Sequence, residues 1–600
     1  MIVADYIFES LADRGVKDVF TVSGGGIMYL LDALGRNPDI DYWCNYHEQA
    51  CAIAAESYAR IQGDIGVCLV TTGPGSANAL SAITGAWLDS VPVVVISGQV
   101  RTGLIADYSK HRQIGPQEIN IIDMARPVTK YAKTIMNGHD VPAELEAAIA
   151  AATSGRPGPV WLNIPLDVQA VEIDPRPEQA RRGTSSQSAI PGLNRPAGVR
   201  DVLSLLIGSQ RPLVVAGNGI HAAAVEEVFE RFVTALGCPV VTTMGGMDLL
   251  EESHPLYLGR FGPTGQRRAN FTLQNADLLL CLGTSMSVSS AGFDTARLAP
   301  RAKRVMVNID GPEMEKPHFH TDFRLLADLK WFMERLLADP ASKDVAPAQR
   351  WIDAVARWKH DYPIVTSDYF EDTDHVNSYV LASRLSESML PGDVLLTGNG
   401  TDAVSAHHSF AVKKGQRVIT NYGFGAMGWD LPAAVGACIA RGGARTVLVT
   451  GDGSMQMNVQ ELLTIGHNHL NVKVFVLNNE GYESMRATQT AFCDSRFVAC
   501  HPGSGVANPD FEKLAAAYGL RYELLSKNDE LAAGLVDVMA TDGPWLCEVN
   551  VSPDQEKRPR IASRRRPDGS FESSPLDDQY PFLPREERDA VMSTFADPEA

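Results

Sequence analysis

Two short polar motifs, GDG at 451–453 and NN at 478–479, carry residues suited to divalent-cation chemistry. Each follows an apolar, β-branched run, which predicts two strands with a helix between them. In such a unit, ligands bind at the carboxyl ends of the strands. The Asp452 carboxylate, the Asn479 side-chain oxygen and a main-chain oxygen near Gly481 are hard donors of the kind that Mg²⁺ takes. Three such donors leave room for phosphate oxygens and water.

Either motif alone has an ordinary structural explanation, with Asp452 as a helix cap and Asn478 and Asn479 as turn residues. Joined with 24 residues between them, the motifs resemble the GDG and NN signature of thiamin-diphosphate-dependent enzymes. The resemblance implies that Asp452, Asn479 and the Gly481 carbonyl hold Mg²⁺, which in turn holds the diphosphate of the cofactor. Further cofactor contacts are then expected from the two turns and the helix start behind the first, at Gly451, Gly453, Ser454 and Tyr482.

A second signature lies near the start of the chain. The segment NYHEQACAIAAESYAR at 45–60 begins at a predicted strand end and enters an Ala-rich helix, so Glu48 would ordinarily be a first-turn helix residue. Together with TTGPGSANALSAITGAWLDSVPVVVISGQV at 71–100, it resembles the pyrimidine-binding domain of the acetolactate synthase family. The resemblance implies that Glu48 hydrogen-bonds the aminopyrimidine ring, and that Pro74 and Asn78 belong to the same cofactor site.

Two segments between these signatures also match the family. NYGFGAMGWDLPAAVGA at 421–437 resembles the segment that bends thiamin diphosphate into a V, which makes Met427 the apolar wedge between the rings and places Gly425 beside it. Without the flanking residues, Met427 would be read as an ordinary core methionine. DVLLTGNGTD at 393–402 resembles the strand and turn where Asn399 and Gly400 meet the diphosphate.

The implied mechanism divides the work between cofactor and protein. The cofactor attacks a 2-oxo acid through its thiazolium carbanion and stores the electron pair when CO₂ leaves. Glu48 would exchange a proton with the pyrimidine ring, and Met427 would hold the ring against the reacting carbon. In this family, the pyrimidine site of one subunit meets the diphosphate site of another. The resemblance therefore implies a homodimer or homotetramer in which Glu48 and Asp452 of different chains serve one cofactor.

The expected substrate side lies in the first part of the chain. VSGGGIMYLLDAL at 22–34 resembles the family's Gly-rich turn near the substrate, and the resemblance implies that Gly25 lies at the substrate site. The family's Phe-Gln-Glu segment is IGPQE here, so Gln117 remains while Pro116 replaces a substrate-facing Phe. The loss of that wall suggests room for a larger acceptor. His111, in the same loop, either faces this pocket or lies on the surface.

Three features depart from acetolactate synthases. No Trp follows NN until Trp545, which weakens an assignment to branched-chain amino acid synthesis. The extended tail with YPFLPREE resembles that of carboligases from sugar pathways, which implies a keto-sugar acceptor, and it would also suit an active-site lid. The middle part lacks the family's Arg-rich FAD segment, although Arg260, Arg267 and Arg268 could meet a diphosphate. Binding of FAD is left open.

Strands that alternate with helices must position these residues. Apolar runs followed by Gly-rich turns recur, and the pattern restarts after two polar stretches, which predicts doubly wound parallel sheets. We therefore expect an α/β fold with three doubly wound parallel-sheet domains and an irregular C-terminal tail. The expected boundaries are 1–170 for a pyrimidine-binding domain, 171–199 for a linker, 200–340 for a central Rossmann-like domain, 341–364 for a second linker, 365–552 for a diphosphate-binding domain and 553–600 for the tail.

Composition excludes several classes of protein. The chain has 600 residues and a net charge of −19, which argues against wrapping nucleic acid or lying on anionic membrane. The apolar runs are far shorter than the ~20 residues of a membrane span, and the N-terminal segment lacks the basic region of an export signal. Nine scattered cysteines without a CxxC pair favour a reduced, cytoplasmic protein rather than structural zinc or disulfides.

The sequence thus predicts a thiamin-diphosphate carboligase. It would decarboxylate pyruvate or a related 2-oxo acid and transfer the acyl carbanion to a carbonyl acceptor. Because NNEGY resembles the decarboxylase form of the motif, a 2-oxo acid decarboxylase with a proton as acceptor is an alternative. A non-catalytic scaffold or regulatory relative is a third, which the presence of Glu48, Asp452 and Asn479 argues against.

Overall fold

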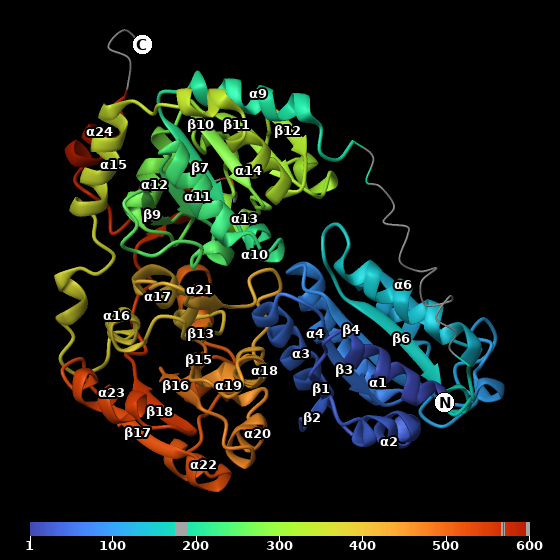
Figure 1. Cartoon of the computed structure of the whole chain (residues 1–600). Coiled ribbons are helices and arrows are strands. Elements are labelled where there is room, and N and C mark those ends of the chain that lie inside the picture. The colour runs from blue at the N-terminus through green and yellow to red at the C-terminus, as the bar shows by residue number, and fades with distance from the viewer. Residues whose placement is uncertain (175–189, 191, 566–567, 569–570, 596–600) are drawn as a thin grey trace.

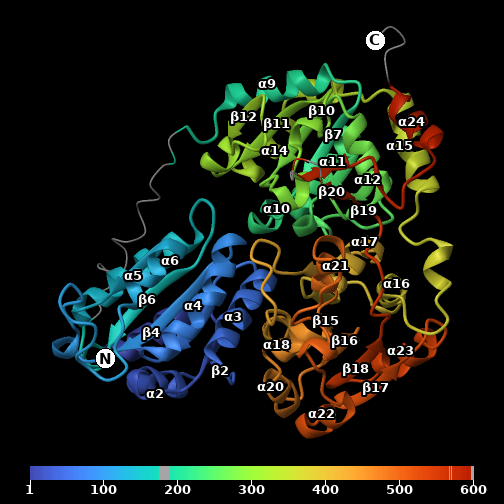
Figure 2. The ribbon, with the colours of Figure 1, turned by 180° about the vertical axis from the view of Figure 1, so that it is seen from behind.

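The computed structural model describes residues 1–174, 190, 192–565, 568 and 571–595. Within them the chain forms three α/β domains, blue, green and orange in Figure 1, each built on a six-stranded sheet. The strands of these sheets pair in parallel, and helices cover them (Figures 1 and 2). Such sheets need continuous apolar strands, as in the fully buried β4 (Val93–Gln99). The predicted fold class is confirmed.

The first domain has the strand order β2-β1-β3-β4-β6-β5. Its other strands are β1 (Asp18–Thr21), β2 (Asp41–Cys44), β3 (Gly66–Val70), β5 (Tyr131–Thr134) and β6 (Val160–Pro165). Its helices are α1 (Val3–Asp13), α2 (Met28–Arg36), α3 (Glu48–Gln62), α4 (Pro74–Leu88), α5 (Ile121–Ala125), α6 (Val141–Thr153) and α7 (Leu166–Gln169). Most of the predicted linker at 171–199 lies outside the described residues.

The central domain has the order β12-β11-β10-β7-β8-β9, which is the Rossmann arrangement. Its strands are β7 (Pro212–Ala216), β8 (Val240–Thr242), β9 (Tyr257–Arg260), β10 (Leu278–Leu282), β11 (Lys303–Asn308) and β12 (Phe323–Leu326). Its helices are α9 (Pro196–Ile207), α10 (Gly219–Ala222), α11 (Glu226–Leu236), α12 (Arg267–Asn275), α13 (Val288–Ala291), α14 (Leu329–Leu337) and α15 (Gln349–Asp361). Helix α15 lies in the predicted second linker and buries Trp351 and Trp358 in the central core.

The third domain repeats the strand order of the first, as β14-β13-β15-β16-β18-β17. Its strands are β13 (Val394–Thr397), β14 (Arg417–Ile419), β15 (Thr446–Gly451), β16 (Val472–Asn478), β17 (Arg521–Leu525) and β18 (Trp545–Asn550). Its helices are α16 (Ser378–Ser388), α17 (Thr401–Ser409), α18 (Asp430–Ala440), α19 (Asp452–Gln456), α20 (Glu461–His467), α21 (Glu483–Phe492), α22 (Phe511–Tyr518) and α23 (Leu531–Ala540).

Helices α3 and α18 join the first and third domains, and each follows the second strand of its domain. Both are Ala-rich, and together they form one continuous apolar core with neighbouring strands. A Cβ on Gly436 would clash with the carbonyl of Ala54, so glycine permits the close approach of the two helices. Beside this contact, Glu461 accepts hydrogen bonds from Asn45 Nδ2 at 2.8 Å and from Tyr46 N at 2.9 Å.

The tail from Pro553 is more regular than predicted. It contains β19 (Arg560–Ile561), β20 (Ser563–Arg565), β21 (Phe571–Ser573), β22 (Gln579–Tyr580) and α24 (Arg585–Ser593). It runs from the third domain along the central domain (Figure 2). Ile561 N donates to Pro263 O at 2.8 Å, and the ring of Phe595 packs against Trp351 with centroids 5.5 Å apart. The regularity comes from docking, which supplies the apolar contacts that the tail sequence lacks by itself.

Two further expectations can be compared with the structure. All nine cysteines are free, as their scattered spacing predicted. In the part of the chain that the structure describes, no helix is both long and apolar enough to cross a membrane.

Candidate active site

The GDG and NN motifs meet at the carboxyl edge of the third sheet. Asp452 follows β15, Asn479 follows the neighbouring β16, and the Asp452 carboxylate joins the two turns. Its Oδ1 accepts from Gly453 N at 2.6 Å, and its Oδ2 accepts from Gly481 N at 2.9 Å and Asn479 N at 3.2 Å. Burial raises the pKa of Asp452, while the hydrogen bonds it accepts favour the charged form. The three proposed metal ligands are therefore neighbours.

Two residues that sequence reasoning missed support this corner. Asn508 Nδ2 donates to Asp452 Oδ2 at 2.7 Å and to Asn478 Oδ1 at 2.9 Å. Arg486 on α21 donates to Asn479 O at 2.7 Å and to Pro553 O at 3.1 Å, which ties the NN turn to the start of the tail. A lone Asn in a loop and an Arg inside a helix carry no motif, so the sequence offered no signal for either.

The remaining candidates for diphosphate binding gather around the same edge. Asn399 follows β13 and Gly451 ends β15, and these strands flank the point where the strand order changes direction. Ligands of such sheets bind at this switch point. Asn399 Nδ2 donates to Gly425 O, and Gly428 N donates to Ser454 Oγ at 2.9 Å, so the three turns contact one another.

Local packing explains the glycines and shapes this edge. A Cβ on Gly453 would run into the ring of Tyr482, so glycine lets the GDG turn lie against the tyrosine. Gly425 has a φ of 65°, in the left-handed region that glycine adopts freely. Met427 is half-buried in the turn between Gly425 and Gly428, and Gly400 leads into α17. These positions suit the proposed roles, which remain predictions.

Glu48 occupies the corresponding edge of the first sheet. It begins α3, and its Oε2 accepts from Asn78 Nδ2 at 3.0 Å. A Cβ on Gly75 would lie 3.1 Å from Glu48 Oε1, so glycine lets α4 start close to the carboxylate. Pro74 is the first residue of α4. The structure thus brings Glu48, Pro74 and Asn78 together, and the Glu48 side chain is half-buried.

The two substrate candidates border this group. The Gly-rich turn that contains Gly25 follows β1, and Gly26 N donates to Thr71 Oγ1 at 3.2 Å. Gln117 has a φ of 63°, and its carbonyl packs against Gly73, just before Pro74. Gly25 and the Gln117 side chain are both exposed. His111 is exposed and follows a turn of the same loop.

Glu118, next to Gln117, is buried and holds the loop in place rather than facing substrate. It is 1% exposed and accepts from Ile114 N at 2.7 Å and Gly115 N at 3.0 Å. Burial opposes its charge, but these N–H groups and that of Ala106 hold the pKa of Glu118 below its usual range. The loop carrying Pro116 and Gln117 is therefore fixed from inside by a charged carboxylate.

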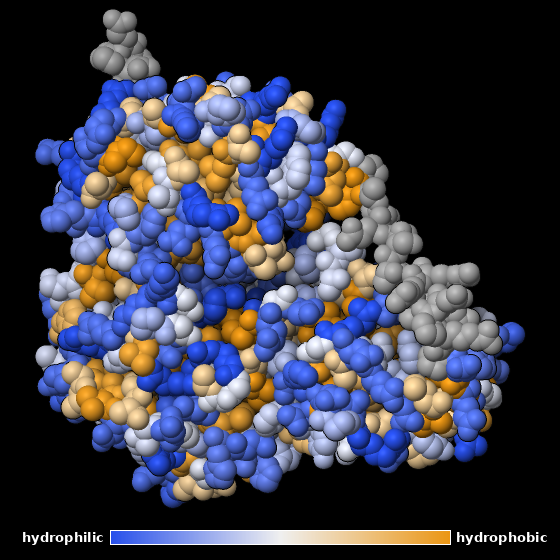
Figure 3. Space-filling model, in the orientation of Figure 1, coloured by the Kyte–Doolittle hydropathy of each residue, from blue (hydrophilic) through white to orange (hydrophobic). Residues whose placement is uncertain are grey.

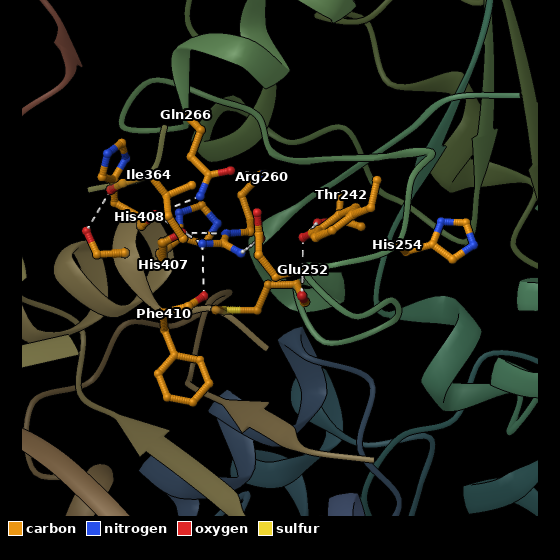
Figure 4. Close-up of polar contacts among 12 residues, drawn as sticks. Thr242, Glu252, His254, Arg260, Gln266, Ile364, His407, His408 and Phe410 are labelled. Carbon is orange, nitrogen blue, oxygen red and sulfur yellow. Dashed lines mark hydrogen bonds and ion pairs between the residues drawn. The ribbon is translucent and has the colours of Figure 1, made fainter. Parts of the chain in front are cut away.

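The arginines of the central domain bind protein groups. Arg260 is fully buried, and Figure 4 shows it among the carbonyls that end α17. It donates to His407 O at 2.6 Å, His408 O at 3.1 Å and Phe410 O at 3.2 Å. Burial beside this arginine lowers the pKa of His408 to about 3, so the imidazole is neutral. Arg260 therefore clamps the central domain to the third.

Arg267 and Arg268 bind protein groups as well. Arg268 pairs with Glu252, and Arg267 donates to the tail carbonyls of Gln579 and Pro581. All three guanidinium groups contact protein groups in this structure, and FAD binding stays an open prediction. The surface is hollowed where the three domains meet, with hydrophilic residues around the hollow (Figure 3).

Comparison with known proteins gives matches along most of the chain. Three models of thiamine pyrophosphate enzymes match: the N-terminal TPP binding domain at residues 1–124, the central domain at 199–336 and the C-terminal TPP binding domain at 398–549. A probable acetolactate synthase large subunit of Methanocaldococcus jannaschii is 30% identical over 564 residues, 92% of each chain. Acetolactate synthase 1 of Zea mays, a chloroplastic protein, is 34% identical over 96% of this chain and 88% of its own. The large subunit of acetolactate synthase isozyme 1 of Escherichia coli is 30% identical over 93% and 95%.

Proposed function

Since this chain belongs to the acetolactate-synthase-like family of thiamine pyrophosphate enzymes, we propose that it decarboxylates pyruvate or a related 2-oxo acid and ligates the acyl unit to a carbonyl acceptor. One observation carries the proposal: the Asp452 carboxylate joins the GDG and NN turns into a single corner next to the switch point of the third sheet.

The residues of this corner suit Mg²⁺ and a diphosphate. Asp452 Oδ1, the Asn479 side-chain oxygen and Gly481 O would hold the metal, a donor set of hard oxygens. Asn399, Gly400 and Ser454 lie at the starts of α17 and α19, where backbone N–H groups favour phosphate. Gly451, Gly453 and Tyr482 would complete the walls, with Gly425 closing the side that faces Met427.

The first domain would supply proton transfer. Thiamin diphosphate provides an acidic carbon and an electron sink for decarboxylation when it is bound. The Glu48 carboxyl, held by Asn78, would give and take a proton at the pyrimidine ring. Met427 would keep the two rings of the cofactor in contact, and such positioning is worth several kcal/mol when the reacting atoms are near attack distance. Gly25 and Gln117 would border the 2-oxo acid.

The acceptor is proposed to be larger than a 2-oxo acid, with a keto-sugar as the leading class. Support comes from the loop fixed by Glu118, where Pro116 and Gln117 are exposed beside the Glu48 group. On the other side of the site, α21 carries no Trp and exposes Met485. The tail, which touches α21 through Lys557 and Glu483, is proposed to cover this entrance.

A homodimer with shared sites completes the proposal. Within one chain, the Glu48 carboxylate contacts groups of the first domain and the Asp452 carboxylate contacts groups of the third. Large apolar side chains from both domains are exposed around α3 and α18. They are Tyr42, Tyr46, Trp87, Leu88, Phe424 and Met457. Contact with a second copy would bury them and bring Glu48 of one chain to the Asp452 corner of the other.

Product analysis tests the function. The protein, supplied with thiamin diphosphate and Mg²⁺, is incubated with pyruvate alone and with a panel of aldehydes, 2-oxo acids and keto-sugars. A new C–C bonded product together with CO₂ is the expected outcome. Acetaldehyde alone, whatever acceptor is present, would establish the decarboxylase instead. Absence of any Mg²⁺-dependent binding of thiamin diphosphate by calorimetry would leave only the scaffold.

A further inference from the structure

Two buried aspartates, Asp402 and Asp430, face each other beneath the turns of the proposed cofactor site. Asp402 lies in the first turn of α17 and Asp430 begins α18, and they are 2% and 0% exposed. A Cβ built on Gly398 would lie 2.8 Å from Asp430 Oδ2 and closer still to Asp402 Oδ2. The two oxygens therefore converge on the small space beside Gly398, one residue before Asn399.

Their hydrogen bonds link three turns. Asp402 Oδ1 accepts from Gly400 N at 2.8 Å, in the turn after β13. Asp430 Oδ2 accepts from Thr450 Oγ1 at 2.5 Å, immediately before the GDG turn, and Asp430 itself follows the turn with Met427. Among the described residues, Asp402 Oδ2 has no hydrogen-bond partner. Asp402 Oδ2 thus lies close to the Asp430 carboxylate without a hydrogen bond of its own from the described residues.

In the part of the chain that the structure describes, no cationic side chain lines the space beside Asp402. A cavity of about 10 Å³ lies against Asp402, and hydroxyl and aliphatic side chains of α16, α17, β13, β15 and β16 line it: Ser378, Ser405, Leu381, Leu395, Val449 and Leu477. At the α17 start, the Glu483 carboxylate accepts a hydrogen bond from Thr401 Oγ1 at 3.2 Å, and Lys557 Nζ neutralises its charge at 2.8 Å. The charged group whose field acts on Asp402 is Asp430.

Such a pair of carboxyl groups is more stable with one shared proton than with both groups ionised. Burial and the Asp430 carboxylate raise the pKa of Asp402 to about 7, and burial raises the pKa of Asp430 as well. Two carboxylates in one desolvated site do not both ionise near neutral pH, because the second charge is repelled by the first. A proton between them also gives Asp402 Oδ2 a partner.

We propose that Asp402 and Asp430 share one proton, and that this acid pair positions the 398–402, 425–430 and 450–454 turns for the diphosphate of the cofactor. The inference rests on the proposed function. Release of the proton to solvent leaves two adjacent negative charges under the diphosphate, which push the turns apart and repel the ligand. Both aspartates are positioning residues, since neither contacts the proposed ligand.

The sign of the pH effect follows from the raised pKa. The pair's contribution to folding is complete below the ordinary Asp pKa of 3.8 and is lost as the pH rises through the folded value of about 7. Cofactor affinity should fall as the pH rises above about 7, where the folded pair loses its proton. Asn at position 402 cannot ionise and can donate to Asp430, so Asp402→Asn should abolish this part of the pH dependence.

Cofactor binding by the apo-protein tests the pair. Thiamin diphosphate is titrated at saturating Mg²⁺ between about pH 6 and pH 8.5, with tryptophan fluorescence as the signal. Asp402→Asn and the wild type should bind about equally at the low end, and the variant should bind at least about three-fold tighter at the high end. Asp393→Asn is the matched control, because Asp393 is a buried carboxylate of the same domain neutralised by Arg445. Its affinity relative to wild type should not change with pH.

Two outcomes would overturn the proposal. One is a constant ratio between Asp402→Asn and wild type across the whole range. The other is an infrared difference spectrum of the wild type that lacks the carbonyl band of a protonated carboxyl at low pH; the band should vanish at high pH and be altered in Asp430→Asn. The presence of the band and its loss at high pH are tested on the wild type alone, without any variant. Failure of the wild type to bind thiamin diphosphate even at about pH 6 would instead reject the cofactor site itself.

Discussion

Glu48 is the residue on which the proposed chemistry depends most. Its carboxyl is held at the start of α3 by Asn78 and packed against Gly75, a position from which it can exchange a proton with a ring above it. Glu48→Gln keeps the shape and the contact with Asn78 but removes the exchangeable proton. Turnover should fall by about 10²- to 10⁴-fold, while binding of thiamin diphosphate changes little.

Steady-state kinetics and a binding titration on the same preparation check this prediction. Glu9→Gln, on the exposed side of α1, is the control and should leave both quantities unchanged. Full turnover by Glu48→Gln would remove the residue from the mechanism.

Asn508 orients the proposed metal corner without being one of its expected ligands. It donates to both Asp452 Oδ2 and Asn478 Oδ1, and so would leave the other carboxylate oxygen, Oδ1, for Mg²⁺. Asn508→Ala should raise the Mg²⁺ concentration needed for half-maximal binding of thiamin diphosphate by about ten-fold or more. Asn468→Ala removes a comparable amide whose Nδ2 donates to the Thr464 carbonyl at 2.8 Å, and should leave the midpoint in place. An unshifted midpoint for Asn508→Ala would show that Asp452 is oriented by the backbone N–H groups alone.

Helices α3 and α18 set the relation between the first and third domains. These helices occupy equivalent places in two domains of the same strand order, and their contact holds the first and third domains of one chain together. The contact is very close at Gly436 and Ala54, where neither helix has a side chain to yield. Close packing of this kind tolerates little added volume.

A pair of helical glycines tests this contact. Gly436→Ala inserts a methyl into the Ala54 carbonyl and should destabilise the protein by about 1–3 kcal/mol, despite the better helix propensity of Ala. Gly35→Ala, in α2, meets nothing within 4 Å and should stabilise by about 0.5–1 kcal/mol. Thermal unfolding of both variants measures the difference. Equal shifts in the same direction would mean that α3 and α18 can separate without loss.

For the molecule as a whole, the sequence was most informative where chemistry depends on local spacing. The GDG and NN motifs end adjacent parallel strands, so their meeting could be predicted from the period of one βαβ unit. Asn508 and the partners of Arg260 could not be predicted, because those contacts depend on how distant loops and domains return to one another. The protein partners of Arg267 and Arg268 could not be predicted for the same reason, since the charge of an arginine is visible in the sequence and its partners are not.

The proposed sharing of active sites between chains concerns the whole assembly and has a decisive test. If Glu48 and Asp452 of different subunits serve one site, a heterodimer of a Glu48→Gln chain and an Asp452→Asn chain contains one doubly altered site and one site with both native residues. Each homodimeric variant should be inactive, whereas the purified heterodimer, isolated through two different affinity tags, should regain about half of wild-type turnover. A heterodimer of Glu48→Gln with wild type should likewise reach about half, which controls for the tags. If each chain instead built its own site from Glu48 and Asp452, every site in the doubly marked heterodimer would carry one substitution, and no activity would return.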